Sequence, residues 1–319
     1  KLYGNTLNTS VSRLEQYRKC PFSYYLQYGL RLKPKEELKV QSFNTGSFMH
    51  ETIDEFFKYV KEEKINLPEL DEIQIQEIVS KIIDENLNLS KNYIFTATAK
   101  YKILVKRLKK IVSQALKYII ETLIYSDFNI EGTEIEFDKK GKYKPIILEL
   151  KDGKRVEIKG KIDRIDTATS DDGKYLRIID YKSSSKNIDL NEVYAGLQIQ
   201  LLTYMDAVCK EEDLMPAGVF YFSLLEQMIK ADKKVSEEEI EDMIRKNFKM
   251  KGLIVADVKI IKMNDNTLES GSSKMVPAAI TKSGTVRHDW TNGVEKEEFK
   301  ILQDYIYKTI KDIAKEILK

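Results

Sequence analysis

The chain has 319 residues, 42% of them hydrophobic and 33% charged, and its formal net charge is only +2. This length suffices for one large domain or two, and the composition is that of a well-charged globular protein. The small net charge excludes a strongly basic protein, so nucleic-acid binding would have to come from local patches, and no run of 18 apolar residues predicts a membrane span.

Two cysteines, Cys20 and Cys209, are too few for a disulfide framework, so they favour a reducing cytoplasm. The first residue is Lys1 rather than methionine, and no apolar leader follows it. We therefore expect a cytoplasmic protein without a membrane segment, and a fragment of a longer chain.

Residues 10–28 combine helix signals with many aromatic side chains. Ser12 and Glu15 have the spacing of a capping box, and Pro21 marks a break or a second helix start. The aromatic residues are Tyr17, Phe22, Tyr24, Tyr25 and Tyr28. Such rings can stack on nucleotide bases, but packing in the core is the interpretation we favour for most of them.

Two helical regions follow. Apolar residues recur at helical spacing over 46–63, a stretch that contains His50, one of only two histidines. Residues 69–126 are predicted to be helical throughout. Five cations between 102 and 110 form a basic face, and phosphate contact and simple solvation explain this face equally well.

Residues 130–150 are predicted to form strands, and a hairpin follows them. The runs Val156–Ile165 and Tyr175–Tyr181 are rich in β-branched and aromatic residues, and a polar turn separates them. In such a hairpin Asp163 can lie beside Asp180. Lys182 points to the same face as Asp180, because strand side chains alternate.

Two carboxylates and an ammonium at one place on a sheet predict a specific chemistry. Adjacent carboxylates repel each other and raise a pKa unless a cation joins them, and Mg²⁺ prefers such oxygen ligands. A lysine beside the cation can orient water and stabilise charge that develops on a phosphate. The pattern therefore favours metal-assisted phosphodiester hydrolysis, with an ordinary surface salt bridge as the alternative. Glu134 and Glu149 are possible further acids, but no spacing argument supports either.

The rest of the chain supplies the predicted framework. A helix is expected over 191–209, with Gln200 and Tyr204 on one face, and a buried strand from Pro216. Residues 236–263 predict a helix and a short strand, 264–293 a long loop, and 296–319 a closing helix. No Walker A loop occurs, so ATP hydrolysis would have to lie elsewhere.

Asp163 with Asp180-Tyr181-Lys182 resembles the signature of the PD-(D/E)xK nuclease superfamily. The strings SRLEQYRKCPFSYYL, GSFMHE, GKIDRID, IIDYKSS and GLQIQLLTYMDA, in this order over residues 10–225, resemble its RecB-type branch. Within that branch they are most similar to the nuclease domain of the AddB family, which forms one half of AddAB-type helicase–nucleases.

The resemblance implies roles for individual residues. Asp163, Asp180, the Tyr181 carbonyl and His50 would bind Mg²⁺ or Mn²⁺, while Lys182, Gln200 and Tyr204 would complete the catalytic set. It also implies that Cys20 is one of four ligands of a 4Fe-4S cluster in a longer parent chain. In the family the other three cysteines lie near the C-terminus. They are missing here, and Cys209 does not match the family's spacing.

The implied fold is α/β, a restriction-endonuclease-like mixed central sheet flanked by helices. We expect a single nuclease domain over 1–319, with a core at about 40–64 and 130–225, a helical insertion at 69–126 and an extension at 236–319. The implied function is cleavage of single-stranded DNA by exonuclease action at processed ends, in recombinational repair of double-strand breaks with an AddA-type partner. A non-catalytic DNA-binding scaffold and a stand-alone exonuclease of the CRISPR-adaptation type are the alternatives.

Overall fold

The computed structural model describes residues 3–33, 42–89, 95–226 and 235–319. Its helices are α1 (Val11–Lys19), α2 (Pro21–Tyr24), α3 (Ser42–Glu62), α4 (Glu72–Leu87), α5 (Ala99–Ile124), α6 (Leu190–Tyr194), α7 (Gln200–Glu212), α8 (Glu237–Phe248), α9 (Val258–Asn264) and α10 (Lys296–Ile317). None of the described helices is both long enough and apolar enough to cross a membrane.

The main sheet has six strands in the order β11-β8-β7-β6-β5-β2. These strands are β2 (Asn129–Phe137), β5 (Gly160–Ser170), β6 (Gly173–Lys182), β7 (Met215–Ser223), β8 (Lys251–Val255) and β11 (Gly293–Val294). β6 pairs with β7 in parallel and with β5 in antiparallel orientation, so the sheet is mixed. This arrangement confirms the predicted α/β fold class.

Two smaller sheets accompany it. One joins β1 (Thr6–Thr9), β4 (Arg155–Ile158) and β3 (Ile146–Glu149), and the other pairs β9 (Gly271–Ser272) with β10 (Ala279–Ile280). β1 runs parallel to β4, which places the N-terminal segment beside the strand that leads into β5. This part of the chain is thereby fixed next to the central hairpin.

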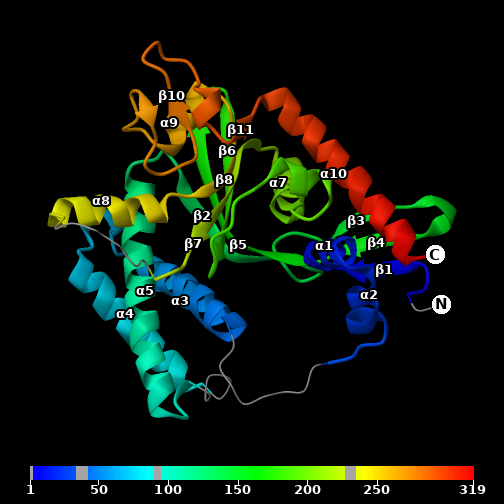
Figure 1. The fold of residues 1–319 in the computed structure, drawn as a ribbon, viewed down its shortest axis with the longest axis horizontal. Coiled ribbons are helices and arrows are strands. Elements are labelled where there is room, and N and C mark those ends of the chain that lie inside the picture. Colours follow the sequence, from blue (N-terminus) through cyan, green and yellow to red (C-terminus); the bar gives the residue numbers. More distant parts are fainter. Residues whose placement is uncertain (1–2, 34–41, 90–94, 227–234) are drawn as a thin grey trace.

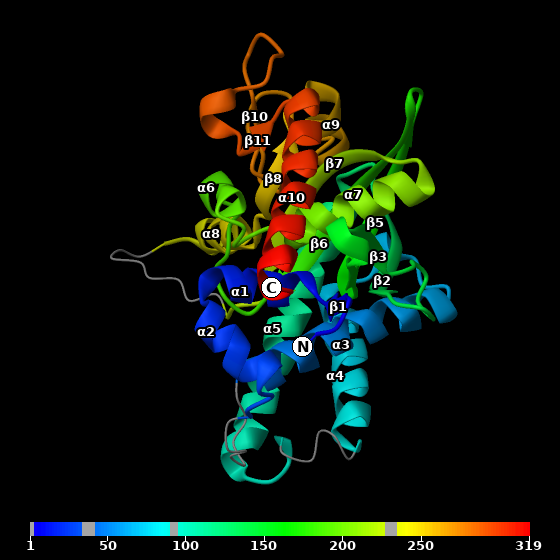
Figure 2. The ribbon, with the colours of Figure 1, turned by 90° about the vertical axis from the view of Figure 1, so that its right-hand side faces the viewer.

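Helices cover the main sheet on both sides. In Figure 1, α7 and then α10 lie to the right of the sheet, while α3, α4, α5 and α8 lie to its left and below it. The central strands are accordingly buried on both faces, as the fully covered side chains of Leu176, Ile178 and Ile179 in β6 illustrate. Figure 2 shows α10 crossing in front of the sheet and ending near α1 and both chain termini.

Several predicted boundaries were wrong. The hairpin turn is shorter than expected, since β5 continues to Ser170 and pairs there with Gly173. The helix expected over 191–209 is interrupted after α6, where Gly196 adopts a φ of +78° and ends the helix in a left-handed turn. The region 69–126 is not helical throughout, because α4 ends at Leu87 and Thr98 caps the start of α5.

Two further expectations need correction. The predicted capping box of Ser12 and Glu15 does not form; Ser10 caps α1 instead, accepting a hydrogen bond from the Arg13 N–H. The stretch 264–293 is not only a loop, since it contains β9 and β10 and leads into β11, which joins the edge of the main sheet beside β8. Residues 40–41 of the expected core and 90–94 of the expected helical insertion lie outside the described residues.

Candidate active site

Three acidic side chains form a row across neighbouring strands. The β5–β6 register pairs Arg164 with Ile179, so Asp163 and Asp180 are the next residues along the two strands. The β2–β5 register pairs Thr133 with Arg164 and Ile135 with Ile162, which leaves Glu134 opposite Asp163. We call Glu134, Asp163 and Asp180 the acidic row. Strand register brings its three members together.

Glu134 is the member of the row that no spacing argument supported. It lies in β2 with a φ of +50°, a left-handed conformation that is rare for a residue other than glycine. A strict alternation along β2 therefore does not predict its direction. Its carboxylate forms an ion pair with Lys161 of β5 and is only 13% exposed.

His50 reaches the acidic row from outside the sheet. It lies on α3, and its Nδ1 is 3.3 Å from Oδ2 of Asp163. The same oxygen accepts a hydrogen bond of 2.8 Å from the Tyr181 N–H. The Tyr181 phenol points elsewhere and accepts a hydrogen bond of 3.2 Å from the buried Arg164. Asp163 is thus held in place between the helix and strand β6.

Asp180 and Lys182 form an ion pair at the end of β6. Asp180 is 5% exposed, and burial together with the neighbouring Asp163 carboxylate raises its pKa to about 6. Lys182 and His50 act in the opposite direction, but they do not cancel the effect. The cations of the site therefore only partly offset the cost of burying the Asp180 carboxylate beside Asp163.

Gln200 and Tyr204 approach the row from α7. Gln200 is the first residue of this helix, and its side chain is hydrogen-bonded to the buried Tyr204 phenol, which also bonds to the backbone of Lys161. Gly160 makes this approach possible, because a Cβ atom there would lie 1.8 Å from the Tyr204 hydroxyl. Burial raises the pKa of Tyr204 above its ordinary value, so the phenol stays protonated and can donate.

Glu15 is a second residue whose role the sequence did not indicate. Its Oε1 accepts hydrogen bonds from the N–H groups of Ile199, at 2.8 Å, and of Gln200, at 3.0 Å. α7 lacks a capping side chain of its own, so Glu15 on α1 caps it from 184 residues away along the chain. The separation explains why no local motif could reveal this contact.

Comparison with protein families adds the decisive observation. The family model of the PD-(D/E)XK nuclease superfamily matches residues 8–318, which is almost the whole chain. The chain belongs to the PD-(D/E)XK nuclease superfamily. The predicted family and the nuclease class are thereby confirmed.

Individual relatives of this PD-(D/E)XK chain point the same way. It is 40% identical over 324 residues to a protein of Acetivibrio thermocellus that is named as the B subunit of an ATP-dependent helicase/deoxyribonuclease. Proteins of the same name from Ruminiclostridium cellulolyticum and Clostridium novyi are 39% and 40% identical. In each case all of this chain aligns, but it covers only 28% of the relative's length.

The donor atoms suit the divalent metals that PD-(D/E)XK nucleases use. One ligand atom from each of His50, Glu134 and Asp163 can be chosen so that all three lie within 4.8 Å of one another. Carboxylate oxygens with one imidazole nitrogen fit Mg²⁺ or, better, Mn²⁺. A cation bound beside Asp180 would favour the ionised form of this carboxyl group and so offset the burial and the Asp163 charge that raise its pKa.

The cysteines do not form a cluster site in this PD-(D/E)XK chain. Cys20 is exposed at the junction of α1 and α2, where its Sγ accepts a hydrogen bond of 3.4 Å from the Ser23 N–H. Cys209 is buried in α7 and contacts the Met205 sulfur at 3.6 Å. Two cysteines in such different places do not supply the four thiolates of an iron–sulfur cluster.

The basic face of α5 is partly neutralised. Arg107 donates to Glu226, with Nε at 3.1 Å, and Lys109 lies 2.7 Å from an oxygen of Asp84. These ion pairs favour the interpretation of this face as an ordinary solvated surface.

Proposed function

We propose that this chain is the metal-dependent nuclease domain of an AddAB-type helicase–nuclease, and that it hydrolyses phosphodiester bonds of single-stranded DNA at processed ends. The observation that carries the proposal is the acidic row, with His50 at one side and Lys182 at its end. The relatives named for an ATP-dependent helicase/deoxyribonuclease support DNA as the substrate and a helicase–nuclease as the setting.

In this proposal His50, Glu134, Asp163 and Asp180, with the Tyr181 carbonyl, hold Mg²⁺ or Mn²⁺. The metal supplies Lewis-acid stabilisation of charge on the phosphate. Lys182 is oriented by its ion pair with Asp180, and its ammonium stabilises the negative charge that develops on the scissile phosphate. Gln200 and the protonated Tyr204 phenol support Lys182 and the scissile strand from α7.

The relatives' names support a helicase–nuclease setting, and the family resemblance supports a role in DNA repair. We propose that residues 1–319 act as one nuclease domain, in the cytoplasm, with an AddA-type partner in recombinational repair of double-strand breaks. A 4Fe-4S cluster is proposed only for a longer parent chain. In support, the last helix, α10, packs against α1 and so ends near Cys20. Its Glu316 lies 3.9 Å from Arg18, which is two residues before Cys20.

Cleavage of a labelled single-stranded oligonucleotide with Mg²⁺ or Mn²⁺ tests the proposal. Lys182→Met should lower the cleavage rate by about 100-fold or more while DNA binding persists. Lys174→Met is the matched control, because it removes the same charge from the opposite end of β6. If the unmodified chain neither cuts nor gains thermal stability with Mn²⁺, a non-catalytic scaffold replaces this proposal.

A further inference from the structure

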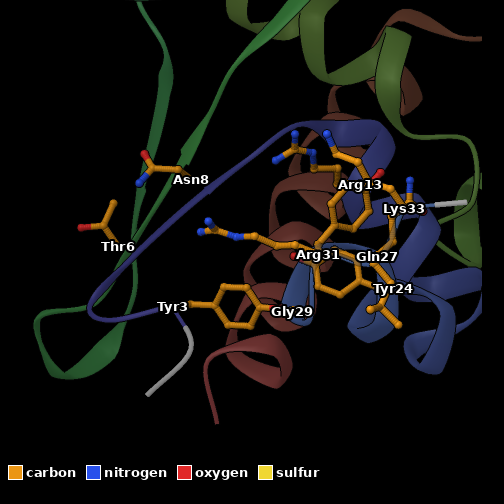
Figure 3. Close-up of a pocket in the computed structure, with 11 residues that line it drawn as sticks. Tyr3, Thr6, Asn8, Arg13, Tyr24, Gln27, Gly29, Arg31 and Lys33 are labelled. Atoms are coloured by element: carbon orange, nitrogen blue, oxygen red, sulfur yellow. The ribbon is translucent and has the colours of Figure 1, made fainter. Parts of the chain in front are cut away.

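A separate cavity of about 640 Å³ opens beside α1, and no member of the acidic row lines it. Its wall comes from the N-terminal segment, from α1, from the last residue of α2 and from the residues that follow α2 (Figure 3). The residues that give it its chemistry are Tyr3, Arg13, Tyr24, Tyr28, Arg31 and Lys33. The volume lies in the range of roughly 300–1,000 Å³ that small-ligand sites occupy.

The cavity is positively charged. Arg13, Arg31 and Lys33 line it, and no carboxylate of the described residues does. None of these three cations forms an ion pair within the part of the chain that the structure describes. Glu157 of β4, in register with Asn8, is buried and does not line the cavity. Three cations around one hollow favour an anionic ligand.

Arg31 is held in an unusual backbone conformation, with a φ of +56°. The Leu32 N–H donates to the Leu26 carbonyl at 3.0 Å and closes this turn. In Figure 3 the Arg31 side chain extends across the cavity toward Thr6 and Asn8. A left-handed arginine costs backbone energy, and here that conformation turns the guanidinium into the cavity.

Aromatic rings form the other part of the wall. The rings of Tyr24 and Tyr28 pack with centroids 5.0 Å apart, and Arg13 lies 4.8 Å above the Tyr28 ring. Gly29 is needed beside them, because a Cβ atom there would lie 2.9 Å from the Tyr25 ring and 3.2 Å from the Tyr3 hydroxyl. Rings next to arginines are the surface on which single-stranded nucleic acids stack their bases.

We propose that this cavity is a second binding site for single-stranded DNA, away from the acidic row, with phosphates on Arg13 and Arg31 and a base against Tyr28. The inference rests on the proposed function. It gives α1 two tasks, since Arg13 faces the cavity while Glu15 caps the helix that carries Gln200. A strand bound here is held by the same helix that fixes α7.

Binding is tested without cleavage, in the full 319-residue chain carrying Lys182→Met and with EDTA present. Arg13→Gln with Arg31→Gln should weaken binding of a fluorescent oligothymidylate about tenfold. The slope of log K against log salt should become less steep by about 1.4, two contacts at about 0.7 each. Lys262→Ala with Lys282→Ala removes the same charge from α9 and the segment after β10, at the other end of the molecule, and should change neither quantity (Figures 1 and 2).

Tyr28→Leu separates base stacking from charge. It should weaken binding of oligothymidylate by about fivefold or more, but leave binding of an abasic strand of equal length unchanged. Equal losses in the control pair, or no loss in the arginine pair of a protein with unchanged melting temperature, would overturn the cavity proposal. Cleavage by the unmodified chain is scored separately, so the nuclease assignment and the cavity can fail independently.

Discussion

The backbone conformation of Glu134 determines where its carboxylate lies. With φ at +50° it departs from the strand alternation, and a carboxylate oxygen lies within 4.8 Å of ligand atoms of Asp163 and His50. In the proposed metal site, a cation bound by Glu134, Asp163 and His50 would offset both the backbone strain at Glu134 and the repulsion between the two carboxylates.

We therefore predict that Glu134→Gln weakens metal binding. Saturating Mn²⁺ should raise the melting temperature of the unmodified chain, since a ligand at about 100 times its Kd stabilises by about 2.7 kcal/mol. In Glu134→Gln this shift should fall by at least half. Glu136→Gln, on the same strand with an exposed side chain, is the matched control and should keep the full shift. An unchanged shift in both variants would remove Glu134 from the site.

Asp180 gives a prediction about pH in the metal-free protein. Its pKa is raised from 3.8 to about 6, so between these values the folded state binds more protons at Asp180 than the unfolded chain does. The free energy of unfolding contributed by this group therefore falls as pH rises through the window, by about 2–3 kcal/mol. Below pH 3.8 the Asp180 carboxyl is neutral in both states and does not destabilise the fold. Above about pH 6 it is ionised in both states, and its full destabilising effect is present.

Asp180→Asn removes the destabilising effect of the buried, ionised carboxylate. In EDTA the variant should be more stable than the unmodified chain at about pH 7 and no more stable at about pH 4, as urea unfolding would measure. Adding Mn²⁺ should abolish or reverse the difference, because a cation stabilises the carboxylate and not the amide. If the difference in stability between the two proteins were the same at both pH values, the pKa of Asp180 would not be raised in the folded protein.

At the scale of elements, α7 depends on α1. The N-terminal N–H groups of α7 are satisfied by Glu15, and this helix carries both Gln200 and Tyr204 to the acidic row. The positive charges of Lys182 and Lys186 stabilise the ionised form of the same Glu15 carboxylate. The end of α7 is therefore positioned by a side chain from the motif that contains Cys20.

Glu15→Ala should destabilise the fold by about 1–3 kcal/mol, because two partly buried donors lose their acceptor, and it should also lower the cleavage rate. Glu15→Gln keeps an acceptor oxygen and should retain most of the rate. Asp71→Ala removes a comparable cap from α4 and should cost stability without affecting cleavage. If both alanine variants lose the same fraction of activity, Glu15 acts only through stability.

The same elements show what could be predicted from the sequence. The strands of the hairpin follow from two runs rich in β-branched and aromatic residues that a polar turn separates, and Asp163, Asp180 and Lys182 come together because the register of a short hairpin is a local property. Glu134 could be named only as a possible further acid, because its left-handed conformation departs from strand alternation, and the role of Glu15 was missed because its partners lie in a distant helix. The break before α7 was missed because Gly196 ends α6 within an apolar, helix-like pattern.

At the scale of the whole molecule, a buried charge cluster joins the sheet to the helices behind it. Asp166 lies between Arg164, at 2.9 Å, and Arg177, at 2.8 Å, and all three side chains are fully buried. Arg177 also donates to Asn264 at the end of α9 and lies 4.5 Å above the Phe128 ring. The Arg164 guanidinium donates in turn to Tyr181, the residue between Asp180 and Lys182.

This cluster holds two guanidinium groups against one carboxylate, so its stability depends on Asp166. Asp166→Asn should lower the free energy of unfolding by about 3–5 kcal/mol, because it leaves two buried like charges without a counterion. Asp166→Asn combined with Arg177→Met should recover part of this loss, since one uncompensated charge is then replaced by an apolar side chain of similar length. Urea unfolding of both variants measures this, with Asp171→Asn at the exposed hairpin turn as a control that should change little. A double variant no more stable than Asp166→Asn would show that the cluster's hydrogen bonds, rather than its charge balance, hold the sheet to α9.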